Sequence, residues 1–320
     1  MRRSKLTMHP ALVHCLQAPT DVPATDTLAQ WLPGWQQRLN GPADASALAL
    51  LGGFAADRMA WAFAAGYQAA LRALLPGCAP HEVLALCLTE TTGNRPRDLR
   101  CTATPQADGS WRLQGHKSWA TFGPAASTLL VIAVQSPDPA DVAPAHPRLR
   151  ALRVAAGTPG VRIDVGSATR LVPELPHARL ALDDVPVAPQ ACLPGDGFSD
   201  YGKPFRTLED LYVSTAVLAY LLREARARQW PAPLRERLTA ALALLASLAT
   251  APADAAATHV ALAGALAWAR DLHADVQPLW AAVADDPAAQ RWQRDAPLLG
   301  VAGTARAQRA DRAWVRLAGS

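Results

Sequence analysis

The N-terminal part of the chain carries its hydrophobic side chains at the spacing of α-helices. Residues 27–39 and, more clearly, 48–75 repeat apolar positions about every 3.6 residues. The second stretch runs from Leu48 to Leu75 and is followed by Pro76-Gly77, a pair that ends helices. This part of the chain is therefore predicted to be helical.

Near Val83 the pattern changes to that of short β-strands. An apolar run covers 84–88, and residues 99–113 alternate around the Ala-Asp-Gly-Ser sequence at 107–110, which predicts a hairpin. The continuous apolar run at 128–134 is typical of a strand buried on both faces. A proline-rich connection at 137–147 and short strands near 149–155, 161–165 and 178–187 complete a predicted β domain.

Helical spacing returns after the Pro-Gly-Asp-Gly sequence at 194–197. Prolines separate four segments, whose antiparallel packing would bury their apolar stripes as a bundle. These segments cover roughly 204–228, 232–249, 253–281 and 287–317. The predicted fold class is therefore α+β and mostly α, with an N-terminal helical domain at 1–83, a central β domain at 84–194 and a C-terminal helical bundle at 195–320.

Composition narrows the expected partners and compartment. Only 18% of the 320 residues are charged, and the net charge of +4 is scattered, with no basic run longer than Arg2-Arg3-Ser4-Lys5. A nucleic-acid partner is therefore not expected. Polar residues interrupt the apolar run after this opening, so neither an export signal nor a membrane span is predicted. Five widely spaced cysteines without a C-x-x-C pair indicate reduced core thiols of a cytoplasmic protein.

Common catalytic motifs are absent from the sequence. No G-x-G-x-x-G follows a strand, no G-x-S-x-G is present, and the eight histidines form no H-E-x-x-H, so a Rossmann fold, a serine hydrolase and a metal site are not expected. His14, His259 and His273 are interpreted as helix-surface or hydrogen-bonded core residues. Five tryptophans are too widely spaced to mark one helical face and are interpreted as core or interface anchors: Trp230, Trp268, Trp280, Trp292 and Trp314.

Two segments of the predicted β domain carry the most specific signal. Cys87-Leu88-Thr89-Glu90 is followed by a loop, a hairpin and Gly115-His116-Lys117-Ser118-Trp119-Ala120-Thr121-Phe122-Gly123. Their order, spacing and residue types resemble the Thr-Glu-Pro and Lys-x-Trp-Ile-Thr-Asn segments of the acyl-CoA dehydrogenase family. The resemblance continues at Asp183-Asp184-Val185-Pro186-Val187 and at Arg294-Asp295-Ala296, with Gly303-Thr304 and Gln308-Arg309 downstream, and covers about residues 48–317.

This resemblance implies a flavoprotein that oxidises an acyl thioester with bound FAD. By matching position, the strand edge Leu88-Thr89 and the segment with Trp119 and Thr121 are expected to face the flavin ring. Both threonine hydroxyls suit this place, because a hydroxyl can donate or accept a hydrogen bond as the ring changes redox state. Gly303 and Thr304, which match the C-terminal segment, are likewise expected to bind the cofactor.

The family's catalytic base is displaced in this sequence. In most members a glutamate that takes the substrate's α-proton precedes the C-terminal Gly-Thr, but Ala302 stands there. Members such as isovaleryl-CoA dehydrogenase carry the base on the first bundle helix, where Glu209 is the matching residue. Glu209 shares a face with apolar neighbours such as Tyr212, which makes it the candidate base; the alternative is an acid favoured by the helix N-terminus. Asp210 is expected to pair with Arg206 at the surface.

Other family features are changed or missing. The Gly-Ser-Asp that helps to hold the pyrophosphate in relatives is replaced by Gly93-Asn94-Arg95-Pro96-Arg97-Asp98, in which Arg95 or Arg97 is a candidate phosphate ligand. No Gln-x-x-Gly-Gly segment is visible in the short bundle. One hypothesis is therefore a working flavoenzyme, and a second is an inactive or repurposed relative that acts as a binding or oligomeric scaffold. A third is an unrelated helical binding protein.

The resemblance also implies partners. The substrate would be an acyl thioester of coenzyme A or of a carrier protein, and an electron-transfer partner would reoxidise the flavin. A homo-oligomer is expected by analogy, because subunits of this family share the outer face of the bundle and the FAD site.

Overall fold

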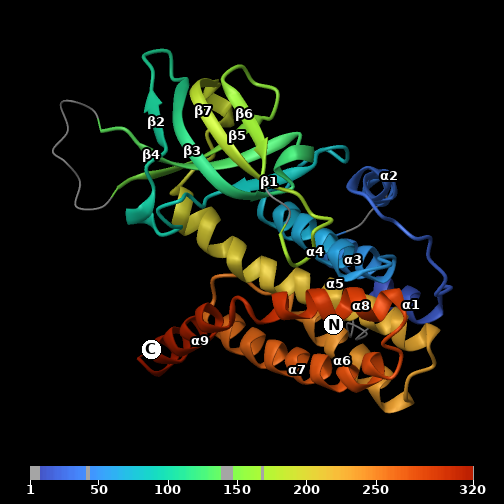
Figure 1. Ribbon diagram of the computed structural model, residues 1–320. Coiled ribbons are helices and arrows are strands. Elements are labelled where there is room, and N and C mark those ends of the chain that lie inside the picture. The colour runs from blue at the N-terminus through green and yellow to red at the C-terminus, as the bar shows by residue number, and fades with distance from the viewer. Residues whose placement is uncertain (1–7, 41–43, 138–146, 167–168, 320) are drawn as a thin grey trace, which may run out of the picture. The chain divides into compact units, whose positions relative to one another are not determined.

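The computed structural model describes residues 8–40, 44–137, 147–166 and 169–319 (Figure 1). The basic run at 2–5 and most of the proline-rich connection at 137–147 lie outside these residues. Contacts divide the chain into two units. A helical unit holds the described residues up to Ala73, Arg170–Val172 and those from Thr207 onward, and a sheet unit holds Leu74–Thr169 and Pro173–Arg206. The three domains expected from the sequence stay a prediction, because shared contacts do not test independent folding.

The sheet unit contains seven strands among the described residues. They pair in the order β1-β4-β2-β3-β7-β6, and β5 also pairs with β4. Each strand predicted from the sequence is confirmed, and the turn at 107–110 joins β2 to β3, with Gln106 N donating to Ser110 O over 2.8 Å. The strands are β1 (Leu84–Cys87), β2 (Thr102–Pro105), β3 (Trp111–Thr121), β4 (Thr128–Gln135), β5 (Leu149–Ala155), β6 (Val161–Val165) and β7 (His177–Val187).

Strand β4 explains why its sequence is apolar throughout. Side chains alternate between the two faces of a strand, and both faces of β4 are covered. Leu129 and Val131 join one buried cluster with Leu152 and Leu180. Leu130 and Ile132 join another on the opposite side with Leu88, Leu99 and Leu149. The continuous apolar pattern therefore reflects a strand with no solvent face, as predicted.

The remaining described elements are mainly helical, and two expected helices are divided. The predicted 48–75 helix is interrupted before Arg58, whose buried guanidinium binds Asp26 and Asp57 at 2.8 Å each. The predicted 287–317 helix is interrupted by a 3₁₀ segment, Ala296–Gly300, that contains Pro297, which has no backbone N–H for the helical hydrogen bond. The helices are α1 (Pro10–Gln17), α2 (Leu28–Leu39), α3 (Ala45–Phe54), α4 (Met59–Leu74), α5 (Lys203–Ala227), α6 (Ala232–Leu248), α7 (Ala256–Ala281), α8 (Pro287–Asp295) and α9 (Gly303–Ala318).

Small residues and tryptophans together form the core of the helical unit. A Cβ on Gly53 of α3 would overlap the Ala216 carbonyl of α5, so the glycine permits a close helix crossing. Trp280 of α7 lies 5.1 Å from Trp230 and 6.2 Å from Trp292 between ring centroids. These three predicted anchors therefore meet in one buried cluster, while Trp314 on α9 is 60% exposed.

The cysteines and the helix lengths bear on chemistry and environment. All five cysteines are free thiols. Burial raises the pKa of Cys87 to about 12 and that of Cys101 to about 11, so both thiols stay protonated and serve as packing residues. None of the described helices is long and apolar enough to cross a membrane.

Candidate functional site

Trp119 lies near the end of β3 in a strained and exposed position. Its φ is 56°, in the left-handed region that bulky residues rarely adopt. The cause is a bulge, because the three steps from Lys117 to Ala120 on β3 face only two on β7. The side chain is 64% exposed. Strained residues of this kind cluster at ligand sites, and here the strain turns a flat aromatic surface outward.

A buried ion pair lies next to this bulge. Lys117 Nζ is 2.7 Å from Glu90 Oε1, and the lysine side chain is fully buried. Glu90 also accepts the backbone N–H of Cys101 over 3.0 Å and that of Arg100 over 2.7 Å. A buried charge is tolerated when it is paired and hydrogen-bonded in this way. Both residues belong to the two motif segments, but nothing else in the sequence indicated their pairing.

The same pair fixes Thr89 beside the Trp119 segment. Ser118 N donates to the Thr89 carbonyl over 2.7 Å, which joins the end of the β1 segment to the bulge. Thr89 is half-buried. Leu88, by contrast, is buried in the apolar cluster, and its carbonyl accepts from Lys117 Nζ over 3.4 Å. A cofactor contact by the Leu88 side chain has no support from this position, and any role for Leu88 stays a prediction.

Thr121 completes the group and brings in a residue that the sequence had not suggested. Thr121 pairs with His177 across the β3–β7 ladder, with 3.2 Å between Thr121 Oγ1 and His177 Nδ1. The imidazole also meets Trp119 edge-on, with ring centroids 6.2 Å apart. Burial lowers the pKa of His177, so the ring is neutral at pH 7. Thr89, Trp119 and Thr121 therefore lie near one end of β3, and their contact with a flavin stays a prediction.

The loop that replaces the family's Gly-Ser-Asp leaves its arginines in solvent. Asp98 turns the loop by accepting the Arg95 backbone N–H over 3.1 Å. Arg97 is 75% exposed and lies only loosely, at 3.8 Å, from the Asp98 carboxylate. Both arginine side chains are thus accessible to an anionic group. Their proposed contact with phosphate stays a prediction.

In the helical unit, Asp210 differs from its expected role. Its carboxylate is buried and binds two arginines of α9, with 2.7 Å to Arg306 Nε and 2.6 Å to Arg309 Nη2. The expectation of a surface pair with Arg206 was therefore wrong. The sequence rule for pairs four residues apart favours contacts within one helix, and it cannot detect partners almost a hundred residues away.

The Asp210 pairs link the two helices that carry Glu209 and the Gly303-Thr304 segment. Glu209, half-buried on α5, directly precedes Asp210. Gly303 and Thr304 begin α9 and are exposed, just before Arg306. Ala302 offers no side-chain cap, so the first N–H groups of α9 are open to another partner. The Asp210 pairs hold the beginning of α9 against α5, but the roles of Glu209, Gly303 and Thr304 remain predictions.

Two histidines of α7 behave differently. His259 is a hydrogen-bonded core residue, as interpreted, with Nε2 2.8 Å from the Ala253 carbonyl and Nδ1 3.3 Å from Arg316. His273 has a buried Nε2 without a hydrogen-bond partner among the described residues. Burial, with a smaller contribution from Arg306, lowers the pKa of His273 to about 4. This ring therefore stays neutral, and it meets Trp292 of the tryptophan cluster edge-on, with ring centroids 6.1 Å apart.

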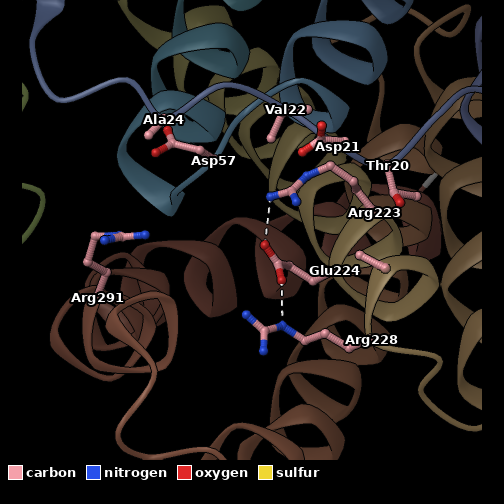
Figure 2. A pocket seen from close by; sticks show the side chains of 10 residues that line it. Thr20, Asp21, Val22, Ala24, Asp57, Arg223, Glu224, Arg228 and Arg291 are labelled. Carbon is pink, nitrogen blue, oxygen red and sulfur yellow. Dashed lines mark hydrogen bonds and ion pairs between the residues drawn. The ribbon is translucent and has the colours of Figure 1, made fainter.

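A polar pocket of about 420 Å³ lies at the other end of α5 (Figure 2). Its centre is Glu224, whose two oxygens are each 2.7 Å from Arg223 or Arg228. This place is about 20 Å along the helix from Glu209. The lining contains three arginines (Arg223, Arg228 and Arg291) and three acids (Asp21, Asp57 and Glu224). Because these charges balance, the pocket gives neither an anion nor a cation a net attraction, and we assign it to packing.

Comparison with solved structures identifies the fold. The chain resembles butyryl-CoA dehydrogenase from Megasphaera elsdenii with a TM-score of 0.67 and 17% identity, covering 90% of each chain. It resembles FMN-bound TdsC, a dibenzothiophene monooxygenase from Paenibacillus sp. A11-2, with a TM-score of 0.69 and 17% identity, covering 88% of this chain and 86% of that one. It also resembles a glutaryl-CoA dehydrogenase from Mycobacterium smegmatis in complex with FADH2, with a TM-score of 0.55 and 14% identity, covering 85% of this chain and 89% of that one.

These similarities establish the acyl-CoA dehydrogenase fold, as predicted from the sequence. No protein-family model matches the chain, and no curated relative matches it. The solved proteins include dehydrogenases and a monooxygenase, so one fold serves more than one flavin chemistry. Among the described residues, no three His, Cys, Asp or Glu side chains gather to hold a metal ion. Function must therefore be argued from the site residues themselves.

Proposed function

We propose that this protein is a flavin-dependent oxidoreductase that binds FAD at Thr89, Trp119 and Thr121 and oxidises an acyl thioester. The observation that carries the proposal is the strained and exposed Trp119, which follows two residues after the fully buried Lys117. Left-handed backbone at a bulky residue costs on the order of 1–3 kcal/mol. Sequences retain such costly local features mainly where a site needs them.

The residues suit a flavin in shape and in hydrogen bonding. The Trp119 ring offers a flat apolar surface, and the Thr121 hydroxyl offers a group that can donate or accept beside it. The exposed Arg95 and Arg97 are candidates for the phosphates, since guanidinium groups bind phosphate oxygens well. When bound, FAD would supply the acceptor for the two electrons removed from the substrate.

Glu209 is our candidate for the base that takes the α-proton of the substrate. Its neighbour Asp210 is unsuited to this work, because both of its carboxylate oxygens are held by Arg306 and Arg309. Glu209 is half-buried on α5, and a carboxylate is one of the side chains that act as general bases. The structural relatives named butyryl-CoA and glutaryl-CoA dehydrogenase support coenzyme A as the carrier, with a carrier protein as the alternative.

A second candidate function is an inactive or repurposed scaffold of the same fold. Ala302 precedes Gly303 where most members have their base, and the 93–98 loop lacks the usual phosphate-binding serine. Both changes would be tolerated in a protein that no longer turns over substrate. For the flavoenzyme, we also propose that it forms a homo-oligomer in the cytoplasm and that an electron-transfer partner reoxidises its flavin.

The test is an anaerobic titration of the FAD-loaded protein with a panel of acyl thioesters on coenzyme A and on carrier protein. We expect one of them to bleach the flavin absorbance band. Glu209→Gln should retain the flavin but bleach at least about 100-fold more slowly, the usual contribution of a general base. Glu236→Gln, an exposed position on α6, is the matched control and should behave as wild type. Bleaching by no thioester would favour the scaffold.

A further inference from the structure

Backbone hydrogen bonds beside Thr121 and at His177 hold the Thr121–His177 contact in place. Phe122 N donates to the Pro176 carbonyl over 3.0 Å, and Gly166 N donates to the His177 carbonyl over 2.8 Å. The two side chains therefore meet at Oγ1 and Nδ1 as directly paired residues of β3 and β7. The Trp119 ring lies against the same imidazole. His177 is thus held against two of the three candidate flavin residues.

The direction of this hydrogen bond decides what the Thr121 hydroxyl can offer to a ligand. Because the imidazole is neutral, it carries a proton on only one of its nitrogens. If Nδ1 is bare, Thr121 donates its proton to it and the threonine oxygen keeps its lone pairs for a further donor. If Nδ1 carries the proton, Thr121 accepts and its own proton is free to be donated. A neutral histidine in water prefers its proton on Nε2, which favours the first arrangement.

We propose that His177 is a positioning residue that makes Thr121 a hydrogen-bond acceptor toward the flavin, through a bond from Thr121 Oγ1 to His177 Nδ1. This inference rests on the proposed flavin function. A reduced flavin ring carries an N–H at N5 where the oxidised ring has a lone pair. With Thr121 facing N5, an acceptor there would stabilise the reduced ring relative to the oxidised one and would raise the reduction potential of the bound flavin.

The first test needs no flavin. Nitrogen-15 NMR of histidine-labelled apoprotein at neutral pH distinguishes protonated from bare ring nitrogens, and His177→Asn assigns the His177 signals. We expect a bare Nδ1 and a protonated Nε2 for His177. A proton on Nδ1 would overturn the inference while leaving the proposed flavin function untouched.

The second test measures the reduction potential of the FAD-loaded protein. In His177→Leu the Thr121 hydroxyl could donate its proton to the oxidised ring instead of to His177. We therefore expect the affinity for reduced flavin, relative to that for oxidised flavin, to fall about tenfold. This lowers the reduction potential by about 30 mV for a two-electron couple. In a Thr121→Val background the same change should have no effect. His177→Asn, whose amide oxygen can still accept, should stay near wild type, as should His116→Leu at an exposed site on β3.

The outcomes separate the two proposals. A wild-type protein that binds no flavin would reject the proposed function and this inference together. Flavin binding with an unchanged or raised potential in His177→Leu, or with an equal shift in the Thr121→Val background, would reject the inference alone.

Discussion

Lys117 and Glu90 are the residues whose burial most constrains the sheet-unit site. Their side chains are 0% and 6% exposed, so each charge depends on the other for compensation. Such a pair adds little to the free energy of unfolding compared with apolar residues of similar size. Removal of one partner, however, leaves an uncompensated buried charge. We therefore interpret the pair as a contact that positions its neighbours, Ser118 and Thr89, against each other.

Lys117→Met is expected to lower the free energy of unfolding by about 3–5 kcal/mol, because Glu90 is left buried without its cation. The double variant with Glu90→Gln should recover part of this loss, since no charge then remains. Arg97→Met, at an exposed and loosely paired position, is the control and should cost less than about 1 kcal/mol. Urea denaturation measures all three, and equal losses for Lys117→Met and Arg97→Met would contradict the assignment.

His273 predicts a pH dependence of stability. The pKa of a histidine is about 6.5 in the unfolded chain and is lowered to about 4 in the fold. Because the unfolded chain binds the proton more readily, stability is complete above pH 6.5 and declines as the pH falls from 6.5 toward 4, at up to about 1.4 kcal/mol per pH unit.

His273→Leu should flatten this part of the stability curve, whereas His14→Leu, at an exposed position, should leave it unchanged. Urea denaturation at a series of pH values measures both slopes. A wild-type slope that survives in His273→Leu would show that another group is responsible.

Only some of the individual site residues could be predicted from the sequence. Thr89, Trp119 and Thr121 could be named because they lie in two contiguous motifs. His177 and the arginine partners of Asp210 could not, since each depends on a contact between segments distant along the chain. Hydrophobic patterns and local motifs carry no information about such pairs.

Helix α5 is the element of the helical unit against which α3, α4 and α9 pack. Gly53 of α3 and Gly66 of α4 each face the α5 backbone so closely that a Cβ would overlap it. Helix α9 is held on the same helix through Asp210. Glycine in a helix costs about 1 kcal/mol relative to alanine, and here the close approach explains its presence.

Gly53→Ala should therefore destabilise the protein by about 1–3 kcal/mol, because overpacking against Ala216 outweighs the gain in helix propensity. Gly264→Ala on α7 is the matched control. Nothing lies within 4 Å of a Cβ at that position, so it should stabilise by up to about 1 kcal/mol. Thermal denaturation compares the two, and a stabilised Gly53→Ala would refute the close crossing.

Element types were well predicted from periodicity, whereas the interruptions of two helices were not. The strands and the bundle helices lie where the patterns placed them. The division between α3 and α4 depends on the buried Arg58 and its partners, which a hydrophobic pattern does not register. The division between α8 and α9 had a signal in the sequence, Pro297, which the prediction of one helix over 287–317 did not take into account.

For the whole molecule, the acyl-CoA dehydrogenase fold leads to an expectation about assembly. Helix α9 exposes a group of large apolar side chains, Trp314 at 60%, Val315 at 72% and Leu317 at 42%. Contiguous exposed apolar residues often mark association surfaces. The expected homo-oligomer would cover them.

Trp314→Glu should accordingly shift the protein toward monomer in analytical ultracentrifugation, because a charge cannot be buried in an apolar contact without cost. Val165→Glu, at an equally exposed position on β6, is the control and should leave the assembly unchanged. A wild-type protein that sediments as a monomer at all concentrations would contradict the expectation.

Flavin binding by this protein is tested most directly by its visible absorbance after purification, incubation with FAD and gel filtration. We expect a flavin band that elutes with the protein and is lost or greatly weakened in Trp119→Ala, while Trp314→Ala retains it. A colourless wild-type protein that cannot be loaded with FAD would contradict the flavoenzyme and leave the scaffold as the function of this fold.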